Sequence, residues 1–218
     1  MLEKETAIMA YLDVANIIGW QKRLGWKVRV VRLVEQLRAL QNVREVKAYY
    51  GTNERSLSQS EAFNSDVMEA GAILRTKPVK FIRKTVDLGI FFKKMTLNQL
   101  DLGTTTLMKS VVESVQSAGT LIEEPKCNFD VEMTMDLMDD ADRASGFMIF
   151  SGDSDFYAPL ERLKLRGRKI YVVGARGTVS RELFRIADAF IDIGKLYKRS
   201  DPPKSENPAL RAGPRESQ

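Results

Sequence analysis

Residues 147–156 read Phe-Met-Ile-Phe-Ser-Gly-Asp-Ser-Asp-Phe, and this stretch decides the fold. Its first four residues indicate a short buried strand, and the apolar spacing from Phe156 onward indicates a helix. Pro159 fits only the first turn of that helix, so we expect the helix to begin close to Asp155. A buried strand, a tight turn and a helix in this order are typical of an open α/β sheet.

Asp153 and Asp155 follow this strand directly. In one interpretation Asp155 is a helix N-cap and Asp153 a turn residue, since Asp is common in both places. In the other they bind a ligand, because ligands bind at the carboxyl edge of open α/β sheets. The stretch alone does not decide between the two.

The rest of the chain alternates between strand and helix patterns. We expect further strands over residues 7–14, 45–51, 72–76, 168–174 and 190–193, and further helices over 30–41, 54–70, 130–144 and 180–187. This alternation predicts an α/β fold with a mostly parallel central sheet and helices on both faces.

Residues 79–126 fit this alternation poorly. The basic and apolar stretch 79–95 indicates an extended hairpin or excursion, and 111–118 has helical spacing. We expect one domain over residues 1–198 that includes this excursion. Residues 199–218 are rich in Pro, Ser and charge and nearly free of apolar residues, so we expect a disordered C-terminal tail.

The composition excludes several kinds of chemistry. Among 218 residues there is one cysteine, Cys127, and no histidine. An intrachain disulfide, a zinc site built on Cys and His, and Ser-His-Asp or Cys-His catalysis are therefore excluded. Acid–base or metal chemistry must use carboxylates, Lys, Tyr or water, and carboxylate oxygens suit Mg²⁺ or Mn²⁺.

The charge balance allows a polyanionic partner. Lys and Arg total 34 against 29 Asp and Glu, which gives a net charge of +5. No window approaches the roughly 18 apolar residues of a membrane span. The first residues lack the layout of a signal peptide, so we expect a cytoplasmic protein that does not associate with a membrane.

Carboxylates also follow or open other predicted elements. Asp13 ends the first strand, and Asp130 opens a helix. Because parallel strands end at one edge, Asp13, Asp153 and Asp155 can converge there. Crowded carboxylates repel one another unless a cation lies among them, which favours a divalent-ion site. The alternative makes each Asp an independent cap or turn residue.

Three motifs together resemble the NYN family, a branch of the PIN-like nucleases that includes LabA-like bacterial proteins. They are Tyr-Leu-Asp-Val-Ala-Asn at 11–16, Lys-Cys-Asn-Phe-Asp-Val-Glu-Met-Thr-Met-Asp-Leu-Met at 126–138, and Ser-Gly-Asp-Ser-Asp-Phe at 151–156. The resemblance covers roughly residues 7–195. It implies a PIN-like Rossmannoid three-layer sandwich and Mg²⁺- or Mn²⁺-dependent cleavage of RNA.

The resemblance also implies roles for individual residues. Its acidic, metal-binding site corresponds to Asp13, Asp130, Asp153 and Asp155, and its polar supports to Asn16 and Ser151. Lys126 and Asn128 match a Lys-Gly-Asn-x-Asp pattern in which Cys127 replaces the glycine. Asp136 is a weaker candidate, because its turn of the helix points away from Asp130.

The leading hypothesis is a metal-dependent endoribonuclease that acts on single-stranded RNA, with a homodimer left open. We expect Asp13 and Asp153 as direct ligands, with Asp130 and Asp155 completing the shell or holding metal-bound water. Lys126 either neutralises a phosphate oxygen or is a solvated lysine. Candidate contacts to the nucleic-acid backbone, which are equally consistent with exposed charge, are Lys80, Arg83, Lys84, Arg168 and Lys169.

Two other functions compete with this hypothesis. The first is a non-catalytic RNA-binding or scaffold protein of the same fold, which the presence of all four carboxylates disfavours. The second is a phosphatase or phosphotransferase on a similar sheet. Leu-Asp-Val-Ala at residues 12–15 lacks the second Asp, two residues on, that haloacid-dehalogenase enzymes use.

Overall fold

The computed structural model describes residues 7–85 and 121–197. These residues form two compact units. The first unit contains residues 7–49, 64–75 and 130–197, and the second contains 50–63, 76–85 and 121–129. The carboxylates predicted to form the site all belong to the first unit.

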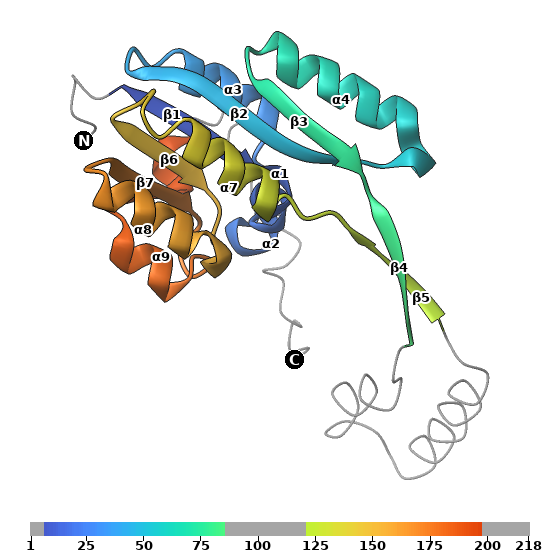
Figure 1. Ribbon diagram of the computed structural model, residues 1–218. Helices are drawn as coiled ribbons and strands as arrows, with labels where there is room; N and C mark the ends of the chain where they lie inside the picture. The colour runs from blue at the N-terminus through green and yellow to red at the C-terminus, as the bar shows by residue number, and fades with distance from the viewer. Residues whose placement is uncertain (1–6, 86–120, 198–218) are drawn as a thin grey trace, which may run out of the picture. The chain divides into compact units, whose positions relative to one another are not determined.

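A six-stranded sheet forms the centre of the fold (Figure 1). Its strand order is β3-β2-β1-β6-β7-β8. These strands are β1 (Ile8–Asp13), β2 (Val43–Thr52), β3 (Ile73–Pro78), β6 (Gly146–Phe150), β7 (Lys169–Gly174) and β8 (Ala189–Asp192). β1 pairs in parallel with both β2 and β6, and β6–β7 and β7–β8 are parallel as well. The predicted α/β fold with a mostly parallel central sheet is confirmed.

Helices flank this sheet, and Figure 1 shows α7, α8 and α9 in front of the strands. The α-helices are α1 (Val14–Gly19), α2 (Gln21–Leu24), α3 (Val30–Arg38), α4 (Leu57–Glu69), α7 (Asp130–Asp139), α8 (Tyr157–Leu165), α9 (Arg181–Ile186) and α10 (Ile193–Leu196). Two 3₁₀ helices, η1 (Glu54–Ser56) and η2 (Ser154–Phe156), precede α4 and α8. None of the described helices is long and apolar enough to cross a membrane.

Residues 147–156 and the residues after them form the expected strand, turn and helix. All five residues of β6 are buried, and so are Phe156, Leu160 and Leu163 on the helix that follows. Pro159 lies in the first turn of α8, where its missing N–H has no cost. The helical path begins with a 3₁₀ turn at Ser154 and becomes α-helical at Tyr157, so the predicted start near Asp155 is confirmed.

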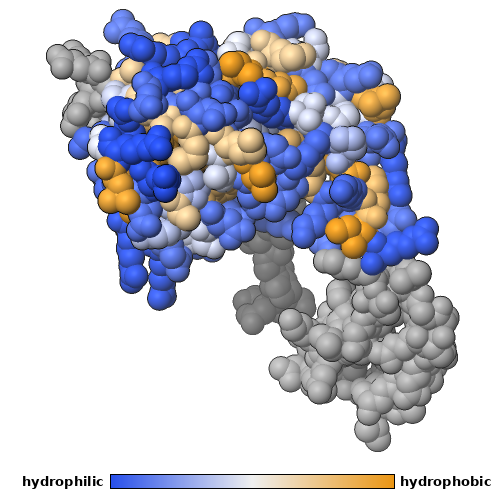
Figure 2. Space-filling view, viewed as in Figure 1, coloured by the Kyte–Doolittle hydropathy of each residue, from blue (hydrophilic) through white to orange (hydrophobic). Residues whose placement is uncertain are grey.

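Two local features differ from the prediction. α7 ends at Asp139 rather than near residue 144, and its buried residues are Met133 and Leu137. Val131 and Met135 are exposed, and Figure 2 shows the hydrophobic residues of the displayed face in separate small groups. The short helix α1 was not predicted from the sequence. The Asp13 side chain caps it by accepting a hydrogen bond from the Asn16 backbone N–H.

The second unit contains an antiparallel hairpin of β4 (Lys80–Thr85) and β5 (Leu121–Lys126). The strand predicted after residue 79 therefore pairs with residues 121–126 instead of within 79–95. The helix predicted at 111–118 and the tail at 199–218 lie outside the described residues. A Cβ on Gly51 would lie 2.8 Å from the Cβ of Cys127, so Gly51 leaves room for that cysteine.

Candidate functional site

The candidate site lies where β1 and β6 end side by side. Leu12 and Phe150 are paired across these parallel strands, so Asp13 and Ser151 leave the sheet at the same edge. The Ser151 hydroxyl donates to Asp13 Oδ2 over 3.2 Å. The two strand ends therefore meet as the parallel sheet predicted, through residues 138 positions apart in the chain. The direct approach of Asp13 to Asp153 and Asp155 stays a prediction.

Asn16 and Ser151 connect the two strand ends. The Asn16 backbone N–H donates to Asp13 Oδ1 (3.0 Å), and its side-chain amide donates to Asp13 Oδ2 (3.3 Å). Asn16 Oδ1 accepts from the Gly152 N–H (3.2 Å), and Ser151 Oγ accepts from the Asp153 N–H (3.2 Å). Both residues predicted as polar supports therefore lie against the carboxylates and fix the loop after β6.

Burial raises the pKa of the Asp13 carboxyl above its usual value. The hydrogen bonds from Asn16 and Ser151 act in the opposite direction, and the negative charge of Asp153 raises the pKa further. A cation beside Asp13 would favour the ionised form of its carboxyl.

Three further carboxylates form a compact group in front of this edge. Asp130, Asp153 and Asp155 each offer an oxygen, and these oxygens lie within 4.8 Å of one another. Asp130 is the first residue of α7, and the other two belong to the β6–α8 connection. The structure thus brings together carboxylates from two separate elements, but Asp13, which we expected to bind the ion directly together with Asp153, is not one of the three. Its role as a direct ligand stays a prediction.

Asp153 has two roles at once. Its Oδ1 accepts from the Asp155 N–H (3.1 Å), and it caps the 3₁₀ helix η2. The cap in this turn is therefore Asp153 rather than Asp155, and capping does not remove Asp153 from the acidic group. A carboxylate has four lone-pair sites, so one hydrogen bond leaves capacity for a cation.

The donor set of this group suits a hard divalent cation. It consists of carboxylate oxygens, the ligands that Mg²⁺ and Mn²⁺ prefer. Within residues 7–85 and 121–197, neither Asp153 nor Asp155 has a lysine or arginine partner. Asp153 is half-buried and Asp155 is exposed, so water solvates part of their charge, and a bound cation would offset the repulsion between them.

Gly152 is a positioning residue that the sequence reasoning did not single out. A Cβ at this position would lie 2.1 Å from the Thr178 carbonyl oxygen. The Ser180 N–H donates to the Gly152 carbonyl over 3.0 Å. The loop that carries Asp153 is therefore packed directly on the β7–α9 loop. A glycine between two strand-end polar residues was the available signal for this close approach.

A second acidic cluster, here called the buried ion-pair network, lies under the far end of α7. Asp140 is 2% exposed and binds the Nζ of Lys47, which is 5% exposed. Asp140 also accepts from Tyr11 Oη (2.7 Å) and Arg143 (2.5 Å). Asp136, one helical turn earlier, accepts from Tyr49 Oη (2.7 Å) and twice from Arg75 (3.1 Å).

These partners change the acidity of the network. Burial would raise the pKa of Asp136, but hydrogen bonds from Arg75 and Tyr49 outweigh it and leave the pKa lowered. Burial is likewise opposed at Asp140, where Lys47 and Tyr11 leave the pKa lowered. Asp136 thus belongs to this network and not to the group of Asp130, Asp153 and Asp155.

The predicted basic contacts lie in two places. Lys80, Arg83 and Lys126 are exposed on the hairpin of the second unit, where Arg83 pairs with Glu123 at 3.5 Å. Asn128 follows β5 and is exposed, while the side chain of Lys84 lies outside the described residues.

The other predicted contacts, Arg168 and Lys169, stand at the start of β7. That position is the sheet edge opposite to Asp13, and Arg168 pairs with Asp142 at 2.9 Å. The structure therefore does not bring these two residues to the carboxylates. Their assignment to nucleic-acid binding stays a prediction.

Fold and site together define a class. A mostly parallel sheet with aspartates at the carboxyl ends of neighbouring strands is the arrangement of α/β proteins that bind ligands at that edge. The model of the NYN domain matches residues 7–194, and the chain belongs to the NYN family. This family has the PIN-like nuclease fold, and its members are generally nucleases, so the resemblance seen in the three motifs is confirmed.

Two relatives support this assignment. The chain is 22% identical to the low amplitude and bright protein LabA of Synechococcus elongatus over 208 residues, which are 95% of this chain and 94% of LabA. A crystal structure of a protein of unknown function from Vibrio parahaemolyticus matches with a TM-score of 0.60 and 19% identity. That match covers 90% of this chain and 99% of the other, and it shows a shared fold.

Proposed function

We propose that this protein is a divalent-metal-dependent endoribonuclease that hydrolyses phosphodiester bonds in single-stranded RNA. One observation carries the proposal. Asp130, Asp153 and Asp155 bring carboxylate oxygens within 4.8 Å of one another, in a chain of a family whose nucleases are typically metal-dependent. The absence of histidine from the sequence leaves carboxylates as the groups able to hold the ion.

The four carboxylates have distinct tasks in this proposal. Asp130, Asp153 and Asp155 hold Mg²⁺ or Mn²⁺, and Asp13 adds negative charge beside Asp153. A bound ion would stabilise charge on the scissile phosphate and lower the pKa of water. Ser151 and Asn16 keep the Asp13 carboxylate oriented through the hydrogen bonds at 3.0–3.3 Å.

A carboxylate-to-amide change tests the proposal. Wild type and Asp153→Asn are assayed on a labelled single-stranded RNA with Mn²⁺, with Mg²⁺ and with EDTA. The matched control is Asp139→Asn, the same chemical change at an exposed position of α7. We expect cleavage by wild type and Asp139→Asn that requires the metal, and a loss with Asp153→Asn.

Equal cleavage by wild type and Asp153→Asn would show that cleavage does not need Asp153 and would contradict the proposed site. Tight RNA binding that EDTA leaves unchanged, with no cleavage under either metal, would establish the non-catalytic RNA-binding protein instead. Hydrolysis of small phosphate monoesters alone would point to phosphatase chemistry. Binding and cleavage are read from the same labelled RNA, and hydrolysis of phosphate monoesters is assayed separately with the same preparation.

A further inference from the structure

A groove of about 450 Å³ lies between the loop after β7, helix α9 and strand β8. We call it the α9–β8 groove. Its lining consists of arginines, aromatic rings and small residues, namely Arg176, Gly177, Val179, Arg181, Phe184, Arg185 and Phe190. None of the four carboxylates of the proposed site lines it, so its chemistry is separate from theirs.

The charge of this groove is positive. Three of its seven lining residues are arginines, and no carboxylate of the described residues is among them. Arg176 pairs with Asp192 at 2.9 Å, whereas Arg181 and Arg185 have no ion pair within the described part of the chain. The Nε of Arg23 donates to the Arg176 carbonyl (3.3 Å), which places a further guanidinium beside the groove.

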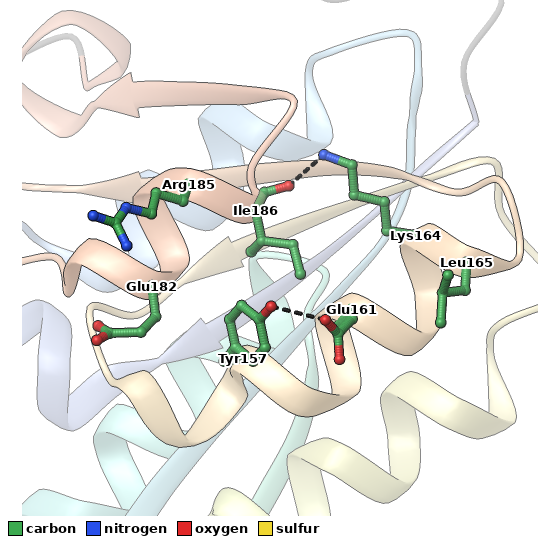
Figure 3. A pocket seen from close by; sticks show the side chains of 7 residues that line it. All are labelled: Tyr157, Glu161, Lys164, Leu165, Glu182, Arg185 and Ile186. Atoms are coloured by element: carbon green, nitrogen blue, oxygen red, sulfur yellow. Dashed lines mark hydrogen bonds between the residues drawn. The ribbon is translucent and has the colours of Figure 1, made fainter.

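A neighbouring cleft has a different character. It lies between α8 and α9 and has mixed charge, with Glu161, Glu182, Lys164 and Arg185 among its lining residues (Figure 3). Its polar groups are largely engaged with one another, since Tyr157 donates to Glu161 (2.8 Å) and Lys164 to the Ile186 carbonyl (2.6 Å). A polyanion is favoured by the α9–β8 groove and not by this cleft.

An aromatic ring is exposed within the arginines. Phe184 is 58% exposed although it is a large apolar residue, and its ring packs on Phe190 with a centroid distance of 5.5 Å at 49°. Phe190 thus supports Phe184 from one side while much of the ring faces solvent. An exposed ring flanked by guanidinium groups is the combination that stacks bases and binds phosphates in single-stranded nucleic acids.

The groove adjoins the loops of the proposed site. Its first lining residues, Arg176, Gly177 and Val179, belong to the loop that packs on Gly152, and the Ser180 N–H donates to the Gly152 carbonyl at 3.0 Å. Helix α9, which carries Phe184, also contacts the η2 turn that carries Asp155. An RNA strand held in the groove would therefore lie next to the elements that carry Asp153 and Asp155.

We propose that the α9–β8 groove binds the single-stranded RNA flanking the scissile phosphate, with Phe184 stacking on a base and Arg181 and Arg185 binding backbone phosphates. This inference rests on the proposed function for the identity of the ligand. The binding it describes needs no metal and no cleavage, so it is measured separately.

The first test measures binding without chemistry. An oligouridylate of about 12 nucleotides, labelled with fluorescein, is titrated with protein in EDTA and followed by anisotropy. We expect Phe184→Ala to bind about tenfold more weakly, the effect of losing one base stack. The matched control is Leu165→Ala, an exposed apolar residue on α8 that should bind as wild type does.

The second test measures the arginines through salt dependence. Each phosphate contact contributes about 0.7 to the slope of log affinity against log salt for a single strand. The double variant Arg181→Ala, Arg185→Ala should therefore lose about 1.4 of this slope. The control Arg162→Ala, Arg166→Ala removes the same charge from exposed positions of α8 and its C-cap, and should lose much less.

The outcomes separate this inference from the proposed nuclease activity. Weaker RNA binding by the groove variants supports the proposal that the α9–β8 groove binds RNA, whether or not wild type cleaves RNA. Normal binding by Phe184→Ala and by the arginine variant overturns the groove, even where wild type cleaves RNA. A change of oligomeric mass with Phe184→Ala at unchanged RNA affinity would overturn it too, because the groove would then hold a second copy of the chain. Far-ultraviolet circular dichroism confirms that each variant is folded.

Discussion

Helix α7 separates two acidic clusters that differ in their partners. At its first residue, Asp130 joins Asp153 and Asp155, and the latter two have no lysine or arginine partner within the described residues. Near its last residue, Asp136 and Asp140 are held by Lys47, Arg75 and two tyrosines. The number of carboxylates is similar, but within the described residues Asp153 and Asp155 lack the basic partners that Asp136 and Asp140 have.

This difference separates a binding site from a structural one. A buried carboxylate costs free energy unless donors and opposite charge surround it. The buried ion-pair network contains those donors in the fold, so a cation would add little. Asp153 and Asp155, which lie with Asp130 at the other end of α7, have no such basic partner in the described part of the chain, so a cation would add more there.

The largest expected effect is on stability, at Lys47. Lys47→Met leaves Asp136 and Asp140 buried without their shared cation, which costs about 3–5 kcal/mol in the free energy of unfolding. Urea unfolding measures it. The double variant Lys47→Met, Asp140→Asn should lose less than the sum of the two single variants, because the two side chains interact. Additive losses would mean that the pair is not coupled.

The second effect concerns the cluster of Asp130, Asp153 and Asp155. Asp153→Asn should lower metal-dependent cleavage by at least about 100-fold, since even groups that only support metal ligands account for 10–100-fold. Thermal unfolding gives a second readout. Mn²⁺ should raise the melting temperature of wild type and of Lys47→Met, and should have little effect on Asp153→Asn. An equal Mn²⁺ shift in all three proteins would place the ion elsewhere.

The third effect is the pH dependence of stability. The pKa values of Asp136 and Asp140 are lowered in the folded state, below the ordinary value of 3.8. The unfolded chain therefore binds protons first as the pH falls. The stabilisation is complete well above pH 3.8 and is lost as the pH falls toward the lowered values. Urea unfolding of wild type between pH 7 and pH 3, roughly the range that covers this transition, should show a steeper loss than in Asp140→Asn. Parallel curves would contradict it.

The smallest effect is expected at Arg75, on the exposed side of the buried ion-pair network. Arg75 is 49% exposed on its side chain and pairs with Asp136 at 3.1 Å. Because solvent screens this pair, Arg75→Ala should cost about 1 kcal/mol or less, well below the cost at Lys47. Chemical denaturation compares the two directly. An equal loss in the free energy of unfolding for Arg75→Ala and Lys47→Met would show that burial does not determine how much each ion pair contributes.

Much of the fold was predictable because its signals are local. The buried run before Ser151, the position of Pro159 and the apolar spacing after Phe156 each fix one element by short-range rules. The meeting of Asp13 with Ser151 followed from one further rule, that parallel strands end at a common edge. The carboxylates of the site were therefore recognisable from their positions at the ends of elements.

The remaining features depend on contacts that no local pattern contains. Helix α1 has β-branched residues and a glycine, so its propensity is low, and the cap from Asp13 helps to fix its start. Arg181, Phe184 and Arg185 of the α9–β8 groove lie on one helix, but the packing of Phe184 on Phe190 of β8 is a tertiary contact. The buried ion-pair network left one visible signal, a lysine inside the apolar strand β2, whose partners are a tertiary contact.

The contact between Gly152 and Thr178 has a mechanical consequence. With no room for even a methyl group there, the β6–α8 and β7–α9 loops interlock, and displacing one displaces the other. A displacement of the β7–α9 loop, which carries Arg176, would therefore also move the backbone of Asp153. In the proposed nuclease, the RNA bound in the α9–β8 groove and the Asp153 carboxylate would then stay aligned while the rest of a long RNA moves past them.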